Sequence, residues 1–134
     1  MYSWQSFDPV NITFGNGIRS HFIDKLDKLR LLIVTSQRGR QQFSKDSILG
    51  TLRENIIWAD KVCANPGLEE TQNQINLLKG ESFDAVIAFG GGSAIDSAKA
   101  LAAALTPGSK TNDLKSLITQ PKSFLNKGIL PIYA

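Results

Sequence analysis

Short apolar runs alternate with helix-like stretches along the chain. The clearest runs are LLIVT at residues 31–35, AVIAF at 85–89 and ILPIY at 129–133, and weaker ones lie at 10–14 and 56–62. Neighbouring side chains of a strand point to opposite faces, so a run that is apolar throughout suits a strand covered by helices on both sides. The runs therefore predict buried strands.

The stretches between these runs carry apolar residues three or four positions apart, which is typical of amphipathic helices. They lie near residues 19–29, 45–55, 68–79 and 93–105. Residues 106–127 are rich in Pro, Ser, Thr and Lys and predict a loop with at most one helical turn, near 114–118. Because parallel strands need crossover connections, which are usually helices, this order predicts a doubly wound parallel α/β sheet.

The composition fits a single soluble globular domain. The 134 residues can support one core, with 42% hydrophobic and 20% charged residues. The net charge of +3 comes from 15 basic and 12 acidic residues, and the scattered basic residues argue against nucleic-acid binding. The N-terminus lacks a signal-peptide pattern, and no apolar run reaches the length of about 18 residues that a membrane span needs. We therefore expect a cytoplasmic protein.

The strongest chemical signal is a strand that runs into three glycines and then directly into a helix. Gly90, Gly91 and Gly92 follow the apolar run, and Ser93 and Asp96 open the helix-like stretch. Backbone amides at such a turn can approach a ligand closely because glycine has no Cβ, and the positive end of the helix dipole favours a phosphate. In doubly wound sheets, ligands bind beyond the carboxyl ends of the strands, which is where this turn lies.

A purely structural interpretation of the same residues also exists. Three glycines can form no more than a tight connection from strand to helix, and Ser93 and Asp96 can form a capping-box pair that only fixes the helix start. We favour phosphate binding because strand, glycine turn and helix follow one another in the order that such motifs require. The spacing matches neither GxGxxG nor a P-loop.

The segment from 90 to 99 resembles the GGGSxxDxxK signature of the iron-containing alcohol dehydrogenase family, which also includes glycerol dehydrogenases, lactaldehyde reductases and maleylacetate reductases. Weaker similarities follow the family's order, with FGNG at residues 14–17, LLIVTS at 31–36, and Asn65-Pro66 before a helix. The resemblance covers essentially the whole chain, although only the glycine motif is specific by itself. The signature is matched at Gly90, Gly91, Gly92, Ser93, Asp96 and Lys99.

This resemblance implies that residues 1–134 form the Rossmann-like, N-terminal NAD- or NADP-binding domain of an enzyme acting on a small alcohol or aldehyde. In the family, an aspartate and histidines of a second, helical domain hold the catalytic iron or zinc, and that domain is absent from this chain. The chain ends directly after an apolar run, which we interpret as truncation at the C-terminal end; an unusually short natural protein is the alternative. The resemblance also implies a homodimer formed through N-terminal strands.

Family positions carried over to this sequence give a set of expected cofactor contacts. Thr35 and Ser36 are implied to lie beside the adenosine ribose, and Asp96 is implied to have a supporting role near the dinucleotide. The residues implied at the cofactor diphosphate are Gly91, Gly92 and Ser93, and Gly90 is expected among the cofactor-binding residues with them.

The residues themselves supply no metal site. His21 is the only histidine and Cys63 the only cysteine, and no pair of carboxylates accompanies either at a ligand-like spacing, whereas iron and zinc need several such ligands. We expect His21 on an exposed or half-buried helix face and Cys63 in the core at the end of a strand. No catalytic or metal-ligating residue is predicted, so iron or zinc belongs only to the full-length enzyme.

The residues after the second apolar run bear on the choice between NAD and NADP. NAD-preferring members of the resembled family often carry aspartate at the position of Ser36, which brings no repulsion to a 2′-phosphate. Arg38 and Arg40, placed in a loop around Gly39, could bind that phosphate with paired hydrogen bonds. The alternative is that both arginines are solvated surface residues. We expect the complete enzyme to accept NADP(H) at least as well as NAD(H).

Two functions from different classes therefore remain. The first is the nucleotide-binding part of a metal-dependent dehydrogenase, inactive as this chain alone. The second is a non-catalytic module that binds a nucleotide or another phosphate-bearing ligand.

Overall fold

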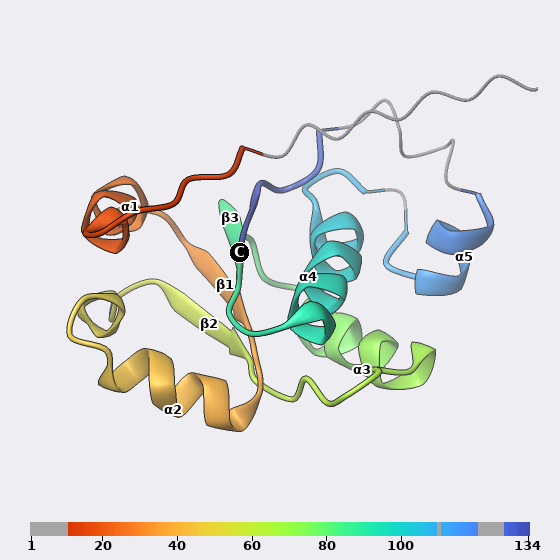
Figure 1. Cartoon of the computed structure of the whole chain (residues 1–134). Helices are drawn as coiled ribbons and strands as arrows, with labels where there is room; N and C mark the ends of the chain where they lie inside the picture. The colour runs from red at the N-terminus through yellow and green to blue at the C-terminus, as the bar shows by residue number, and fades with distance from the viewer. Residues whose placement is uncertain (1–10, 110, 121–127) are drawn as a thin grey trace, which may run out of the picture.

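A computed structural model of the chain describes residues 11–109, 111–120 and 128–134. Four parallel strands form one sheet in the order β2-β1-β3-β4 (Figure 1). The strands are β1 (Leu31–Val34), β2 (Ile56–Ala59), β3 (Ala85–Ala88) and β4 (Ile132–Tyr133). All three pairings are parallel, which confirms the predicted sheet.

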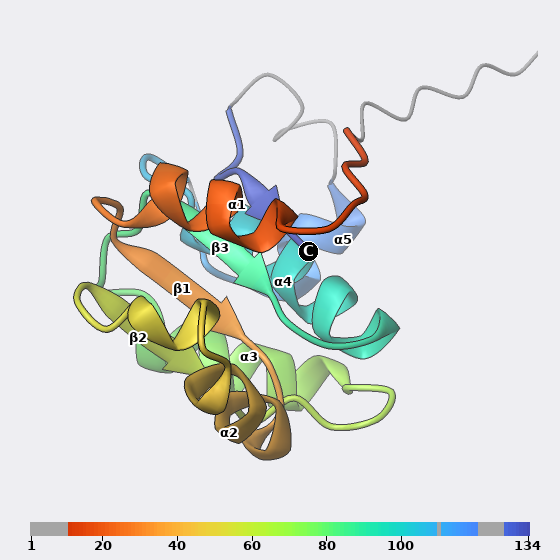
Figure 2. The same cartoon turned by 60° about the vertical axis from the view of Figure 1, so that its left-hand side comes forward.

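Helices cover both faces of this sheet (Figure 2). Helices α1 (Ile18–Leu26) and α2 (Gln37–Lys45) lie on one face, with the 3₁₀ turn η1 (Leu49–Thr51). Helices α3 (Leu68–Leu78) and α4 (Gly92–Leu105) lie on the other, and α5 (Leu114–Thr119) packs against them. The crossovers from β1 to β2 and from β2 to β3 thus run on opposite faces, which makes the domain doubly wound.

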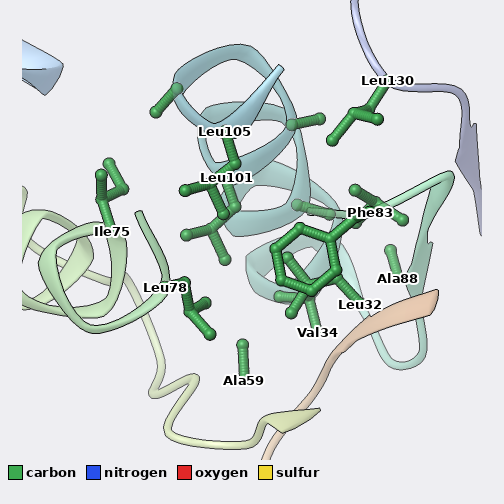
Figure 3. Packing of buried hydrophobic residues seen from close by; sticks show 14 of the residues in the cluster. Leu32, Val34, Ala59, Ile75, Leu78, Phe83, Ala88, Leu101, Leu105 and Leu130 are labelled. Atoms are coloured by element: carbon green, nitrogen blue, oxygen red, sulfur yellow. The ribbon is translucent and has the colours of Figure 1, made fainter. Parts of the chain in front are cut away.

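The apolar strands contribute to the cores on both faces of the sheet, because successive side chains of a strand point to alternate faces. Leu31 and Ile33 of β1 join the core beneath α1 and α2, whereas Leu32 and Val34 join the core beneath α3 and α4. Figure 3 shows the second core, in which Leu101 of α4 belongs to the same cluster as Val34 of β1 and Ala88 of β3. All four β1 side chains are fully buried, and each such burial contributes about 1.5–3 kcal/mol relative to exposure.

The first half of the chain differs most from the sequence-based prediction. A helix was expected at residues 45–55, but α2 begins at Gln37, and only η1 forms in the expected range. Phe43 and Gly39 are the buried residues of α2, so an apolar stripe was hardly visible in QRGRQQFSK. Asp46 ends α2 in an extended conformation, and its side chain accepts hydrogen bonds from the following amides.

Asp46 is expected to make folding stability depend on acid pH. The amide of Leu49 and then that of Ile48 donate hydrogen bonds of 2.9 Å to Asp46 Oδ1, and with the Arg19 ion pair they hold the pKa of this carboxyl below its ordinary value. A lowered pKa in the folded state stabilises the fold above about pH 4, and this stabilisation is lost as the pH falls through the folded pKa.

We therefore predict that Asp46→Ala lowers the urea midpoint at pH 7, and that the difference from the unmodified chain shrinks towards pH 3. Asp46→Asn can accept the same two amide hydrogen bonds without a charge and is the matched control. A difference between Asp46→Ala and the unmodified chain that stays constant from pH 7 to pH 3 would refute this role.

Other expectations differ in smaller ways. Residues 11–14 form no strand, contrary to the prediction, and Val10 lies outside the described residues. Within residues 106–127, α5 extends over six residues, slightly more than the single turn expected. Strands β2 and β4 are shorter than the apolar runs that predicted them. In the part of the chain that the structure describes, no helix has both the length and the apolar character needed to cross a membrane.

Candidate functional site

The sheet has a switch point between β1 and β3. From β1 the chain moves through α2 to β2 on one side, while β3 lies on the other side of β1 and continues into α4. The loops after β1 and β3 therefore diverge at the carboxyl edge of the sheet, and Figure 1 shows the β3–α4 connection beside the end of β1. Crevices at this place in doubly wound sheets are where ligands bind.

The connection from β3 to α4 is anchored at its start and depends on Gly90. The amide of Phe89 donates to the Val34 carbonyl (3.0 Å), which extends the pairing of β3 with β1 by one residue. Gly90 then has φ 152°, a conformation that residues with a side chain rarely adopt, and a Cβ there would lie 3.1 Å from the Ala94 Cβ. Gly90 is therefore required by the fold itself.

Gly91 and Gly92 are different, because nothing in the fold requires glycine at either position. Both are exposed, and a Cβ built on either would meet no atom within 4 Å. Gly91 is the N-cap of α4 and Gly92 its first residue. The first amides of a helix have no earlier carbonyl within the helix to bond, so the amides of Gly92 and Ser93 border an open surface that a ligand can approach.

The helices that follow β1, β2 and β3 begin at this edge of the sheet, and of these three α4 alone begins without a negative or hydrogen-bonding side chain; α1 also lacks both, but it precedes β1 and follows no strand among the described residues. Helix α2 is capped by Ser36, whose Oγ accepts from the Gly39 amide (3.0 Å), and α3 has Glu69 and Glu70 in its first turn. Helix α4 has neither a side-chain cap nor an acidic residue in its first turn. Its positive dipole end therefore suits an external anion.

Ser93 and Asp96 do not form the expected capping pair. Ser93 is the second residue of α4 rather than its N-cap, and its Oγ lies 3.4 Å from the amide of Asn65, which donates to it. The loop after β2 thereby reaches the start of α4. Asp96 is exposed, and its carboxylate lies 3.6 Å from Lys99 Nζ one turn further along. The capping role was wrong for both residues, whereas their expected roles at the cofactor remain predictions.

Thr35 and Ser36 lie where β1 meets α2. Thr35 is fully buried, and its Oγ1 donates a hydrogen bond of 2.6 Å to the Phe89 carbonyl. Ser36 is half-buried at the start of α2. These two residues and the glycine connection are thus neighbours at the switch point, as their expected roles at one ligand require.

Arg38 and Arg40 lie on the first turns of α2 and not in a loop, which corrects the sequence-based placement. The Arg40 guanidinium is engaged, because Nη1 lies 2.7 Å from Asp60 Oδ2 and the group stands 5.0 Å over the Trp58 ring. Arg38 is exposed, and its side chain makes no hydrogen bond or ion pair with any residue that the structure describes. Of the two, Arg38 alone is therefore unengaged.

Comparison with known proteins adds to this geometry. A sequence model described as "Iron-containing alcohol dehydrogenase" matches residues 9–134. The chain belongs to this family. Alcohol dehydrogenase 4 of Saccharomyces cerevisiae, which is similar to it, is 34% identical over 132 residues, covering 94% of this chain and 33% of the yeast protein.

Solved structures of related proteins share the fold. The aldehyde reductase YqhD from E. coli, in a substrate- and cofactor-free form, matches 98% of this chain and 35% of its own with a TM-score of 0.75 and 23% identity. The NADH-dependent butanol dehydrogenase A from Thermotoga maritima matches 97% of this chain and 33% of its own, with a TM-score of 0.69 and 25% identity. This chain thus spans about a third of the length of these relatives.

The described part of this family member offers no place for the family's metal. Across residues 11–109, 111–120 and 128–134, no group of three or more His, Cys, Asp or Glu side chains could hold an ion. His21 is exposed on α1, as expected. Cys63 is also exposed, beyond the end of β2, so its expected place in the core was wrong. The residues that the structure describes therefore do not fit a metal ion.

Several residues of the site had no recognisable sequence signal. The hydrogen bond from Thr35 to Phe89 joins residues 54 positions apart, and the Arg40–Asp60 pair joins residues 20 apart. Such contacts depend on strand order, which sequence periodicity does not contain. Gly39 had a local signal, since glycine within a helix is unfavourable and is kept there for a packing reason.

Proposed function

We propose that this chain is a dinucleotide-binding domain that holds the diphosphate of NAD(P) at the N-terminus of α4. The observation that carries the proposal is the contrast among the three helices that follow directly on β1, β2 and β3 at the carboxyl edge of the sheet. Of these three, only α4 lacks both a capping side chain and an acidic first turn, and a Cβ on Gly91 or Gly92 would meet no atom within 4 Å, which leaves room for a ligand beside the amides of Gly92 and Ser93. Family membership supports the same choice of ligand.

The rest of the cofactor is proposed to extend from this point along the carboxyl edge. The Gly90–Gly92 turn and Ser93 orient the diphosphate, and the first turn of α2, with Ser36 and Arg38, lies on the side of the adenosine ribose. Asp96 is exposed one turn into α4 and is proposed to contact the dinucleotide from the side. The nicotinamide, when bound, supplies the hydride acceptor or donor. The described residues contribute binding and orientation.

The complete protein is proposed to transfer hydride between a small alcohol or aldehyde and the nicotinamide, as a metal-dependent dehydrogenase. Similar proteins are named alcohol dehydrogenase 4, aldehyde reductase and NADH-dependent butanol dehydrogenase, and these names support the substrate class and the use of a nicotinamide cofactor. Iron or zinc would be held by residues outside the described part of this chain. We further propose a cytoplasmic homodimer.

Titration of the 134-residue chain with ADP, NAD⁺ and NADP⁺ tests the proposed site, with adenosine as the matched ligand that lacks phosphates. All three phosphorylated ligands are expected to bind, and adenosine is expected to bind at least about tenfold more weakly because it cannot reach the α4 amides. Equal affinity for ADP and adenosine would contradict binding through the diphosphate.

The 134-residue chain alone is predicted to show no alcohol oxidation, even with added Fe²⁺ or Zn²⁺. The reason is the lack of a metal-binding group among the described residues. The measurement is NADPH formation from NADP⁺ with 1-butanol as the test alcohol. Metal-dependent turnover would contradict the prediction. A longer form of the protein that binds dinucleotide but shows no turnover with any alcohol or aldehyde would favour the alternative, a non-catalytic nucleotide-binding module.

Ser36 and Arg38 are predicted to set the preference between NAD(H) and NADP(H). Ser36→Asp should weaken NADP(H) binding by about tenfold or more, because a carboxylate would face the 2′-phosphate. The helix start should survive, since aspartate is as good an N-cap as serine. Arg38→Ala should also weaken NADP(H) by about tenfold, the effect of losing one charged hydrogen bond, with little change for NAD(H).

Arg40→Ala is the contrasting variant on the same helix. Its guanidinium is held by Asp60 and Trp58, so this substitution is expected to affect stability more than cofactor choice. Titration of both cofactors against the three variants measures the preference. A clear NAD(H) preference in the unmodified protein, or no change in Ser36→Asp, would overturn the assignment.

A further inference from the structure

Thr35 connects three segments at the switch point through its three polar groups. Its amide donates to the Ala59 carbonyl at the end of β2 (3.0 Å), and its carbonyl accepts from the amide of Val62 in the following loop (3.1 Å). Its hydroxyl donates to the Phe89 carbonyl at the end of β3 (2.6 Å). The residue is fully buried, so these bonds form away from water and their loss would leave polar groups unpaired.

The hydroxyl occupies a space that the fold keeps free for it. A Cβ on Gly39 would overlap Thr35 Oγ1, so the first turn of α2 can approach β1 this closely only with glycine at this position. The same Cβ would lie 3.4 Å from the Thr35 Cβ, which is ordinary contact. The hydroxyl therefore lies between α2 and the end of β3, and it is the specific atom that Gly39 accommodates.

The bonded carbonyl of Phe89 belongs to the peptide that enters Gly90. The Thr35 hydroxyl holds the carbonyl end of this peptide. Its amide end belongs to Gly90, whose φ is 152°. Without the hydroxyl, the peptide could rotate, because glycine on its far side offers little steric resistance. The orientation of the amides at the start of α4 would then no longer be fixed.

We propose that Thr35 is a positioning residue for the dinucleotide: its buried hydroxyl fixes the Phe89–Gly90 peptide and thereby preorganises the glycine connection that receives the diphosphate. This proposal rests on the proposed function. It assigns Thr35 a role beneath the site instead of the direct ribose contact that family position implied. A preorganised connection binds more tightly because less conformational freedom is lost on binding.

The first test compares Thr35→Val with Thr35→Ser in the 134-residue chain. Valine keeps the shape and removes the hydroxyl, whereas serine keeps the hydroxyl. Thr35→Val is expected to weaken ADP binding about tenfold, the factor that corresponds to one net hydrogen bond, and Thr35→Ser to stay within about twofold of the unmodified chain. Equal binding by both variants and the unmodified chain would overturn the proposal. If Thr35 had a role in stability alone, Thr35→Val would lower the melting temperature, and ADP binding by the folded variant would not differ between valine and serine.

A ligand-free measurement separates this proposal from the proposed function. Backbone ¹⁵N relaxation of Gly90 and Gly91 is expected to give order parameters near about 0.85 in the unmodified chain and in Thr35→Ser, and to fall towards about 0.6 in Thr35→Val. If no ADP binds to the unmodified chain, the proposed function fails. Unchanged order parameters in Thr35→Val would overturn the positioning role whether or not ADP binds.

A pair of substitutions keeps the test decisive if Thr35→Val does not fold. Gly39→Ala should displace the hydroxyl and loosen the glycine connection while Thr35 is retained. In a Thr35→Ala background, the added Cβ meets no hydroxyl, so Gly39→Ala should cause no further loss of melting temperature. Additive losses in the double variant, or unchanged order parameters in Gly39→Ala, would show that the hydroxyl does not occupy the proposed position.

Discussion

Replacement of Gly92 by aspartate is expected to weaken dinucleotide binding strongly while the fold stays intact. The position is exposed, has open space for a side chain and is the first residue of α4. A carboxylate there would face the diphosphate, and two like charges about 4 Å apart repel by about 4 kcal/mol near a protein surface. Binding of ADP should therefore weaken at least about 100-fold, a change of about 2.7 kcal/mol.

The same substitution should leave the melting temperature unchanged or slightly higher. An acidic residue in the first turn stabilises a helix by about 0.3–1 kcal/mol through the dipole. Gly92→Asn has nearly the same shape without the charge and is the matched control, with ADP affinity expected to fall by less than about tenfold. If both variants bind ADP as well as the unmodified chain does, the α4 N-terminus is not the diphosphate site.

Among the substitutions considered, Phe43→Ala is expected to cause the largest loss in the free energy of unfolding. The loss should be about 3–5 kcal/mol, which is typical of removing a buried phenyl ring. Phe43 is 1% exposed and is the buried apolar anchor of α2. Its ring makes edge-to-face contacts with Trp58 (centroids 5.5 Å apart) and Phe89 (5.2 Å). Because Phe89 precedes the glycine connection, the cavity should also loosen the site.

Urea unfolding measures this loss directly. Phe43→Leu fills much of the same space and should cost clearly less than alanine. Leu77→Ala serves as the surface control, since Leu77 is 73% exposed, and its effect should stay within about 0.5 kcal/mol. If Phe43→Ala cost no more than Leu77→Ala, α2 would not be anchored to the sheet as described.

The strand pattern was predictable because burial on both faces leaves a local signature. Strands β1 and β3 are apolar at every position, and all eight of their residues are buried. The parallel order followed from the alternation of strands and helices. The strand order β2-β1-β3-β4 did not, because it depends on which side of β1 each crossover turns.

Helix α2 could not be predicted from the spacing of apolar residues because it buries few side chains. Two residues, Gly39 and Phe43, face the core, and the rest of QRGRQQFSK is polar. Ser36 is a residue type that commonly caps a helix at its start. The three- and four-residue spacing of the apolar residues at 48, 49 and 52 instead favoured a helix further along the chain. Asp46 interrupts that later segment by taking an extended conformation and accepting hydrogen bonds from the amides of Ile48 and Leu49.

Part of the candidate site was visible in the sequence. The three glycines between an apolar run and a helix predicted a ligand-facing turn, and the structure places them at the switch point of the sheet. The sequence could not separate their roles, since only coordinates show that Gly90 is required by the backbone and Gly92 is not. The contact of Thr35 with Phe89 was equally hidden, because it forms across two strands.

The most direct test of the diphosphate site is a ¹H–¹⁵N spectrum of the 134-residue chain titrated with NADP⁺. Even an affinity of about 1 mM, about −4 kcal/mol, produces saturable shift changes in such a titration. Binding at the start of α4 should place the largest changes on the amides of residues 90–94, with a second group at residues 35–38. Changes confined to other segments, or no saturable change at any residue, would contradict it.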